Sequence, residues 1–262
     1  MMILTVTVGC SNQFLTATPP PPAVTVLSIY STYDTRSLIA HLATQQYEQD
    51  HNVRFVLESN NHQTLLDQLN TERIDYFLSH HNPADDPSEQ WSAPLVQDGL
   101  AFVTHPGNPV QTLSIDELRR IYRGFITSWS ELGGEDANIV LYSREAGAGI
   151  RLEFERLVMG QQRTSPNAQV LSSSQLIAQQ VADDPHAIGY MPISLLNDQT
   201  QVLAIEGQLP SLARIEDNSY PLRTTIYVIG RTEPNRAYRQ FFIEIQNASE
   251  QLLNEQYAPL PR

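Results

Sequence analysis

The chain has 262 residues, a formal net charge of −13 and a sequence pI of about 4.8. This acidic balance argues against nucleic acid as a partner, and against attachment to anionic lipid through a basic patch. The single cysteine, Cys10, excludes an intramolecular disulfide framework, and no later segment is long and apolar enough to span a membrane.

The first 23 residues are predicted to lie outside the folded part. They open with a short apolar run that ends in Val8, Gly9 and Cys10. This pattern resembles the end of a bacterial lipoprotein signal, in which the cysteine is lipidated, although Thr7 stands where leucine is usual and no positive charge precedes the run. A frayed N-terminus with an incidental free thiol is the alternative. The proline- and threonine-rich stretch that follows favours an extended tether.

From Val24 onward, the pattern predicts strands that alternate with helices. Strands are predicted over residues 24–30, 53–57, 74–78, 100–104, 139–142, 188–191, 202–205 and 224–229. Helices are predicted over residues 35–49, 63–72, 115–124, 150–159, 174–182 and 234–256. Ser114 and Glu117 form a capping box at the start of the third helix. Strands that alternate with helices indicate βαβ units and mostly parallel sheets.

The stretch Ser143–Val158 places an arginine and a glycine-rich turn directly before a helix. Gly147 and Gly149 let the backbone approach another group closely, and the first N–H groups of the helix have no partner inside it. Together with the Arg144 guanidinium, these features indicate an anion site. The motif is not a P-loop, because that loop needs a lysine and the chain has none. A plain turn beside an arginine that pairs with Glu145 or another acid is the alternative.

Four segments carry a family resemblance: IYRGFITSWSELGG (Ile121–Gly134), SREAGAGIRLEFE (Ser143–Glu155), HAIGYMP (His186–Pro192) and SYPLRTTIYVIGRTEPN (Ser219–Asn235). In this order and spacing, they resemble the phosphate-type, PstS-like substrate-binding proteins of bacterial ABC importers, in the periplasmic binding protein type II superfamily. The resemblance runs from about Val24 to the C-terminus.

The resemblance implies an α/β fold of two lobes, with mostly parallel sheets flanked by helices and a cleft between the lobes. Lobe 1 would comprise residues 24–104 plus 225–262, and lobe 2 residues 105–224, after a signal end and tether over 1–23. The ligand would be an oxyanion, phosphate first, held by loops of both lobes. Ligand binding would shift the population toward the closed form.

Site residues follow from the resemblance position by position. In the first loop, Ser31 and Thr32 would offer hydroxyl and N–H donors, and Tyr33 could line the cleft. In the second loop, His62 stands nearest the family's serine, as a ligand donor or an exposed loop residue. In the third loop, Ser79 is present, but His80 stands where the phosphate binders have an acid that accepts the proton of a protonated phosphate.

The signature itself departs from the family in two places. Arg144, Gly147 and Gly149 are kept, but Ala148 replaces a serine and Ile150 a threonine. Two hydroxyl donors are therefore lost, and a hydrogen bond to a charged group contributes about 1.5–3 kcal/mol. Phosphate, another oxyanion, a small anionic organic solute and a site without tight binding all stay open as interpretations.

The predicted function is that of an extracytoplasmic solute-binding protein, a monomer that delivers its anion to ABC permease subunits and touches the membrane only through a lipid anchor. The alternative is an anchored sensor or accessory lipoprotein with altered or lost anion specificity. We expect no cofactor and no catalysis, because the folded part has no GxSxG, HExxH or cysteine–histidine pair. His80 and His81 could form a metal pair, but no ligand spacing completes such a site.

Overall fold

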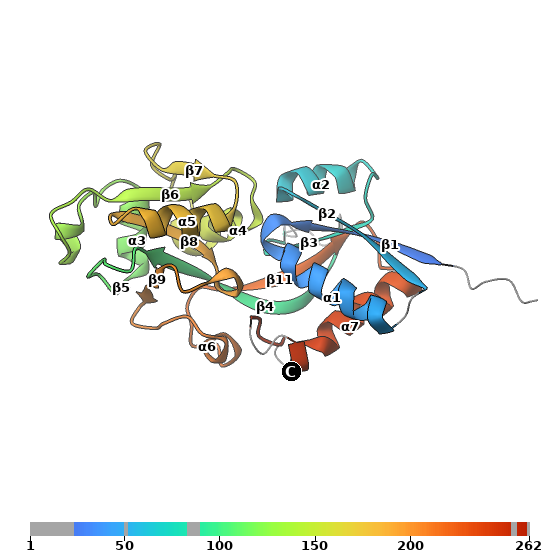
Figure 1. The fold of residues 1–262 in the computed structure, drawn as a ribbon. Helices are drawn as coiled ribbons and strands as arrows, with labels where there is room; N and C mark the ends of the chain where they lie inside the picture. The colour runs from blue at the N-terminus through green and yellow to red at the C-terminus, as the bar shows by residue number, and fades with distance from the viewer. Residues whose placement is uncertain (1–23, 50–51, 83–89, 253–255, 261–262) are drawn as a thin grey trace, which may run out of the picture.

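The computed structural model describes residues 24–49, 52–82, 90–252 and 256–260. These residues form a mixed α/β fold of two lobes (Figure 1). Cys10 and the predicted tether over residues 1–23 lie outside the described residues. Within the described ranges, no helix has the length and apolar character needed to cross a membrane.

One mixed sheet runs through both lobes in the strand order β2-β1-β3-β11-β4-β8-β6-β7, with β9 paired to β4. Its strands are β1 (Thr25–Thr32), β2 (Val53–Asn60), β3 (Tyr76–Ser79), β4 (Trp91–Thr104), β6 (Val140–Arg144), β7 (Gln169–Leu171), β8 (Ala187–Pro192), β9 (Gln201–Val202) and β11 (Arg223–Gly230). A small second sheet pairs β5 (Thr112–Leu113) with β10 (Ala204–Ile205). The outer pairs β1–β2, β1–β3, β6–β7 and β6–β8 are parallel, as the strand–helix alternation predicts. The inner strands β4 and β11 run antiparallel to their neighbours.

Strand β4 joins the two lobes. Its first part pairs with β11 over residues 91–99, and its last part pairs with β8 over residues 100–104. The sequence predicts only this last part, because Pro94 cannot donate to a strand ladder. The register with β11 shifts between Ile226 and Tyr227, opposite Pro94. A bulge of this kind accommodates a proline inside a paired strand.

The helices are α1 (Arg36–Gln49), α2 (His62–Asn70), α3 (Ile115–Tyr122), α4 (Gly149–Phe154), α5 (Ser174–Asp183), α6 (Leu212–Glu216) and α7 (Arg236–Leu252), with short helical turns η1 (Tyr33–Thr35), η2 (Trp129–Leu132), η3 (Glu155–Met159) and η4 (Ile193–Leu195). Six of the seven helices in the described residues lie within a few residues of the predicted positions, and the predicted helix over 150–159 is divided into α4 and η3. The helix over residues 212–216 is not predicted. The predicted capping box is confirmed: Glu117 N–H donates to Ser114 Oγ at 3.1 Å, and Ser114 N–H donates to Glu117 Oε2 at 2.8 Å.

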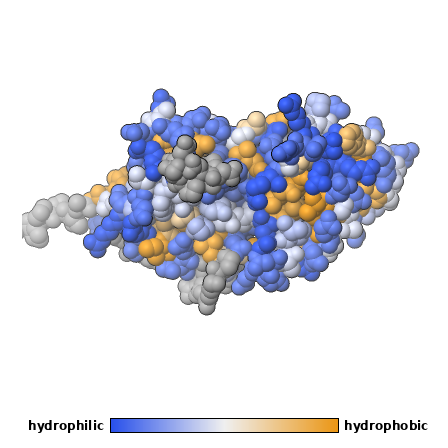
Figure 2. Space-filling view, turned by 180° about the vertical axis from the view of Figure 1, so that it is seen from behind, coloured by the Kyte–Doolittle hydropathy of each residue, from blue (hydrophilic) through white to orange (hydrophobic). Residues whose placement is uncertain are grey.

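In each lobe, helices cover both faces of the sheet. Successive residues of a strand point to opposite faces, so the same strand packs against helices on both sides. In β3, Tyr76 and Leu78 face the lobe 1 core beneath α1 and α7, whereas Phe77 packs with residues of α2. In β4, Phe102 faces the α3 and α4 side of lobe 2, whereas Val103 faces α5. The face of the molecule seen in Figure 2 is largely polar, with apolar residues gathered in patches.

Aromatic rings dominate the lobe 2 core. Phe154 stacks on Tyr190 with ring centroids 4.3 Å apart and an interplanar angle of 12°. Phe102 and Tyr122 pack against both rings. Such rings bury large apolar areas, so this cluster stabilises the lobe that carries the glycine-rich turn.

We therefore expect Phe154→Ala to lower the free energy of unfolding by about 3–5 kcal/mol, measured by urea denaturation. Phe125→Ala is the matched control, because Phe125 is 61% exposed and contacts the Arg123 guanidinium. This control should lose at most about 1 kcal/mol, the value of an exposed cation–π contact. Equal losses in the two variants would contradict the central role of the stacked cluster.

Candidate functional site

Loops from both lobes converge at the carboxyl ends of β1, β2, β3 and β6. The contacts cross from lobe to lobe: Gln63 N–H donates to the Gly147 carbonyl at 3.2 Å, and Asn61 Nδ2 donates to the Ala146 carbonyl at 3.2 Å. Carboxyl ends of parallel strands are the usual ligand-binding edge of an open α/β sheet. The predicted site residues therefore lie at the edge of the sheet where ligands usually bind in this class of fold.

The two glycines of the turn bring the lobes into contact. A Cβ atom on Gly149 would lie 2.6 Å from Ser79 Oγ and 3.6 Å from Thr32 Cγ2. A Cβ atom on Gly147, where φ is +77°, would lie 2.8 Å from Gln63 Cβ. In this conformation, the close backbone approach predicted from the glycines is to the loops of lobe 1. Ala148, between the two glycines, is buried.

Arg144 is buried at the centre of this convergence, and acceptors surround its five N–H groups. Nη1 donates to both carboxylate oxygens of Asp34, at 2.9 and 2.7 Å, and to Ser174 Oγ at 3.0 Å. Nε and Nη2 donate to the two oxygens of Glu145, each at 3.2 Å, and Nη2 also donates to the Ser172 carbonyl at 3.1 Å. The arginine thus pairs with Glu145, as the alternative interpretation allowed, and with a second acid from lobe 1.

These partners keep the guanidinium charged. Burial by itself lowers the pKa of Arg144, because a charge is costly away from water. The facing Asp34 and Glu145 carboxylates outweigh burial, so the pKa of Arg144 is raised above its ordinary value.

Asp34 is the site residue that sequence reasoning missed. It lies in η1, two residues after Thr32, with only 2% of its surface exposed. Besides Arg144, Ser174 Oγ donates to its Oδ1 at 2.7 Å. The available signal was an acid directly after a buried strand, inside the loop predicted to hold the anion. Such a buried acid requires a cationic or hydrogen-bonding partner.

The predicted hydroxyl donors are bonded within lobe 1. Ser31 Oγ lies 2.9 Å from Ser59 Oγ, and Thr32 Oγ1 lies 3.1 Å from Thr35 Oγ1. Ser31 and Thr32 are both buried, whereas the neighbouring Tyr33 is 40% exposed. In each pair one hydroxyl donates to the other, so a ligand oxygen that takes the donating hydrogen replaces the present bond.

His62 and Ser79 form a pair beneath the glycine turn. His62 Nδ1 lies 2.8 Å from Ser79 Oγ, which also accepts from His81 N–H at 3.1 Å. Burial, together with the nearby His81 and against the opposing effect of Glu153, lowers the pKa of His62 to about 3. His62 is therefore a buried, neutral ring rather than an exposed loop residue or a cationic donor.

His80 is directed to the strand that joins the lobes. Its Nε2 lies 2.9 Å from Asp98 Oδ2 in β4. Asp98 also accepts from Ser194 Oγ at 2.6 Å and from Gly99 N–H at 2.7 Å. Nδ1 of His80 is buried and has no hydrogen-bond partner among the described residues. The described residues also contain no cluster of three or more His, Cys, Asp or Glu that could hold a metal ion.

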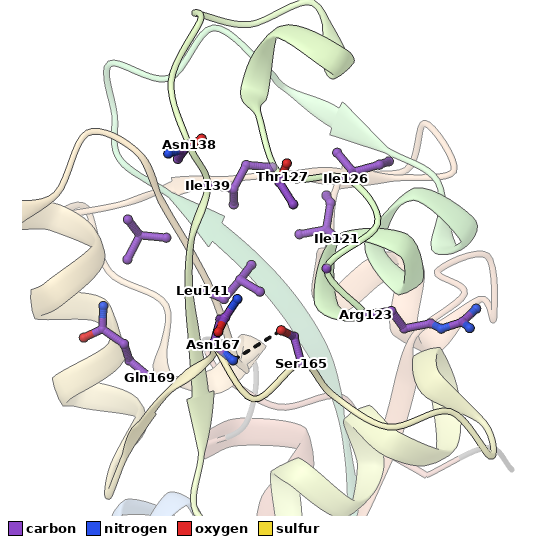
Figure 3. Close-up of a pocket in the computed structure, with 12 residues that line it drawn as sticks. Ile121, Arg123, Ile126, Thr127, Asn138, Ile139, Leu141, Ser165, Asn167 and Gln169 are labelled. Carbon is purple, nitrogen blue, oxygen red and sulfur yellow. Dashed lines mark hydrogen bonds between the residues drawn. The ribbon is translucent and has the colours of Figure 1, made fainter.

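A separate cavity of about 440 Å³ lies at the opposite end of lobe 2, where β6 and β7 begin (Figure 3). It is lined by Ile121, Arg123, Gly124, Ile126, Thr127, Asn138, Ile139, Val140, Leu141, Ser165, Asn167 and Gln169. None of the predicted site residues belongs to this set. The cavity is therefore distinct from the convergence at Arg144.

The neutral state of His62 makes stability depend on pH. The unfolded ring takes up a proton near pH 6.5 and the folded ring only near pH 3, so the free energy of unfolding should fall as pH drops through this window. The loss should reach at most about 1.4 kcal/mol per pH unit. His62→Gln should lack this dependence in urea denaturation series. NMR signals of the His62 ring that titrate between about pH 5 and 8 would contradict the assignment.

The chain is similar in sequence to phosphate-binding proteins of bacteria. The phosphate-binding protein PstS of Bacillus subtilis (strain 168) is 28% identical over 166 residues, which cover 62% of this chain and 55% of that protein. PstS of Borreliella burgdorferi is 22% identical over 163 residues, 58% of each chain. The chain thus matches less than two thirds of the length of these relatives.

Solved structures share the fold. A putative phosphate ABC transporter substrate-binding protein with bound phosphate from Clostridium perfringens has a TM-score of 0.84 at 22% identity, over 90% of this chain and 99% of that one. An ABC-type phosphate transport receptor from Vibrio cholerae has a TM-score of 0.75 at 22% identity, over 89% and 100% of the two chains. A family model described as a PBP superfamily domain matches residues 16–246. The chain therefore belongs to the PBP superfamily.

Proposed function

We propose that this chain is an extracytoplasmic solute-binding protein that captures a small oxyanion, phosphate first, and delivers it to an ABC importer. The observation that carries this proposal is the convergence of loops from both lobes on one buried arginine, Arg144. The names of the relatives from Bacillus subtilis and Clostridium perfringens, both of them phosphate-related binding proteins, support phosphate as the first ligand to test.

Capture requires the present bonds of the site to be exchanged for bonds to the ligand. A guanidinium can hold two oxygens of an oxyanion at once, which makes Arg144 the main binding group. The hydroxyls of Ser31, Thr32 and Ser79 are the next candidates, once they release their present partners. Ile150 cannot take part, because its side chain is fully buried in the lobe 2 core.

In this proposal, the two lobes move as two bodies about β4 and β11. Lobe 1 comprises residues 24–104 and 225–262, and lobe 2 comprises residues 105–224. ABC permease subunits are the protein partners, the chain acts as a monomer, and it performs no catalysis. A second candidate, an anchored sensor or accessory lipoprotein with altered anion specificity, is favoured by one observation: carboxylates already occupy the Arg144 guanidinium.

The binding role of Arg144 is tested by calorimetric titration with inorganic phosphate. Arg144→Ala should abolish detectable binding, and Arg144→Lys should weaken it by at least about tenfold, because an ammonium group cannot make the bidentate contact. Arg239→Ala is the control, because Arg239 pairs with Glu233 on the exposed surface and should leave affinity unchanged. Full phosphate binding by Arg144→Ala, with its fold verified by circular dichroism, would place the site elsewhere.

The anchor is tested in cells that express the protein. If Cys10 is lipidated, the native protein should partition into detergent, and Cys10→Ser should move it to the soluble fraction. A native protein that is already in the soluble fraction, with an unmodified cysteine by mass spectrometry, would contradict the anchor and leave the binding role untouched.

A further inference from the structure

We propose that the carboxylate of Asp34 takes the place of a bound anion between the two lobes. It holds the lobes closed without ligand and competes with an oxyanion for Arg144. The competition rests on the proposed function of the site, whereas the closure does not.

The carboxylate of Asp34 comes from lobe 1 and accepts hydrogen bonds from donors of lobe 2, as a bound anion between the lobes would. It comes from η1 of lobe 1, and both of its oxygens lie within 2.9 Å of Arg144 Nη1 in β6 of lobe 2. Ser174 Oγ, at the start of α5 in lobe 2, adds a third short bond of 2.7 Å. The side chains of Asp34 and Arg144 are only 2% and 1% exposed. Charge-assisted bonds of this kind are among the strong ones in proteins.

The second acid at the guanidinium has a different place in the chain. Glu145 follows Arg144 directly, so its contact with the guanidinium lies within lobe 2. Its bond to lobe 1 is a single hydrogen bond from the neutral Asn61 Nδ2 at 3.3 Å, not a contact between charges. Arg144 thus faces two carboxylates with one positive charge. An incoming oxyanion must therefore displace one of them to make a bidentate contact.

Displacement of Asp34 is costly because it belongs to the same chain. A group tethered near its partner competes at an effective concentration of about the millimolar range or above. Only an oxyanion that binds the remaining donors well can replace it. Asp34 therefore determines how tightly an oxyanion must bind in order to reach Arg144. Removing the charge of Asp34 while keeping its shape should both loosen the closed form and free Arg144 for a ligand.

The first measurement is small-angle X-ray scattering of the full chain in phosphate-free buffer. The wild type should be compact, and Asp34→Asn should show a larger radius of gyration that shrinks when inorganic phosphate is added. Asp116→Asn is the matched control: it also removes one acid that pairs with an arginine, but on the surface of lobe 2, where the Asp116 side chain is 70% exposed. It should behave as the wild type does.

The second measurement is calorimetric titration of the same proteins with inorganic phosphate. Asp34→Asn should bind phosphate at least about tenfold more tightly than the wild type, and Asp116→Asn should bind as the wild type does. Ser174→Ala, which removes one donor to Asp34 but no charge, should shift radius and affinity in the same direction by less. It replaces Asp34→Asn in both measurements if that variant does not fold.

The outcomes separate the two proposals. If the wild type binds phosphate, but the variants keep the wild-type radius and affinity, the role of Asp34 is overturned and the binding function stands. If no variant binds phosphate, but Asp34→Asn opens while the wild type stays compact, the closure by Asp34 stands and the phosphate function fails.

Discussion

A buried guanidinium must find acceptors for five N–H groups, and this requirement organises the centre of the molecule. Arg144 finds them in three places: η1 of lobe 1, its own neighbour Glu145, and the segment at the start of α5. Removing one partner of a buried charge pair costs about 3–5 kcal/mol, because the other charge stays uncompensated. Arg144 therefore couples the positions of the two lobes, of the glycine turn and of α5, beside the bonds of Gln63 and Asn61 to the turn.

The polar groups around this arginine are already bonded to one another. The hydroxyls pair along β1 and β2, Ser79 pairs with His62, and His80 pairs with Asp98. An oxyanion that takes the donor of one of these pairs exchanges a bond rather than adding one, and the net contribution of such a hydrogen bond is only about 0.5–1.5 kcal/mol. The affinity for an oxyanion in such a site depends mainly on which hydrogen bonds among the site residues are weakest. The number of donors that face the ligand matters less.

The site is also connected to the strand that joins the lobes. Asp98, the partner of His80, lies in β4 at the point where its pairing passes from β11 to β8. The same carboxylate accepts from Ser194, beside the end of β8. A change at the carboxyl end of β3 can therefore reach the crossing strand through one hydrogen bond, and η4 through a second. In this way a binding event and a lobe movement can share one network.

Much of the molecule follows from local patterns in the sequence. The alternation of strands and helices, the capping box at Ser114, the glycine turn before α4 and the family motifs are all set by short-range periodicity and backbone chemistry. The α/β class, the PBP superfamily and most elements could therefore be predicted. The first half of β4 could not, because Pro94 hides a strand that only a bulge against β11 makes possible. Nor could Asp34 as a partner of Arg144, or the partners of His62 and His80, although the sequence did offer Glu145 as a partner of Arg144. Asp34 is 110 residues from Arg144 along the chain, and Asp98 is 18 residues from His80. The packing of the two lobes brings Asp34 to Arg144, and the packing within lobe 1 brings Asp98 to His80. A contact between distant segments depends on the whole fold rather than on any local pattern.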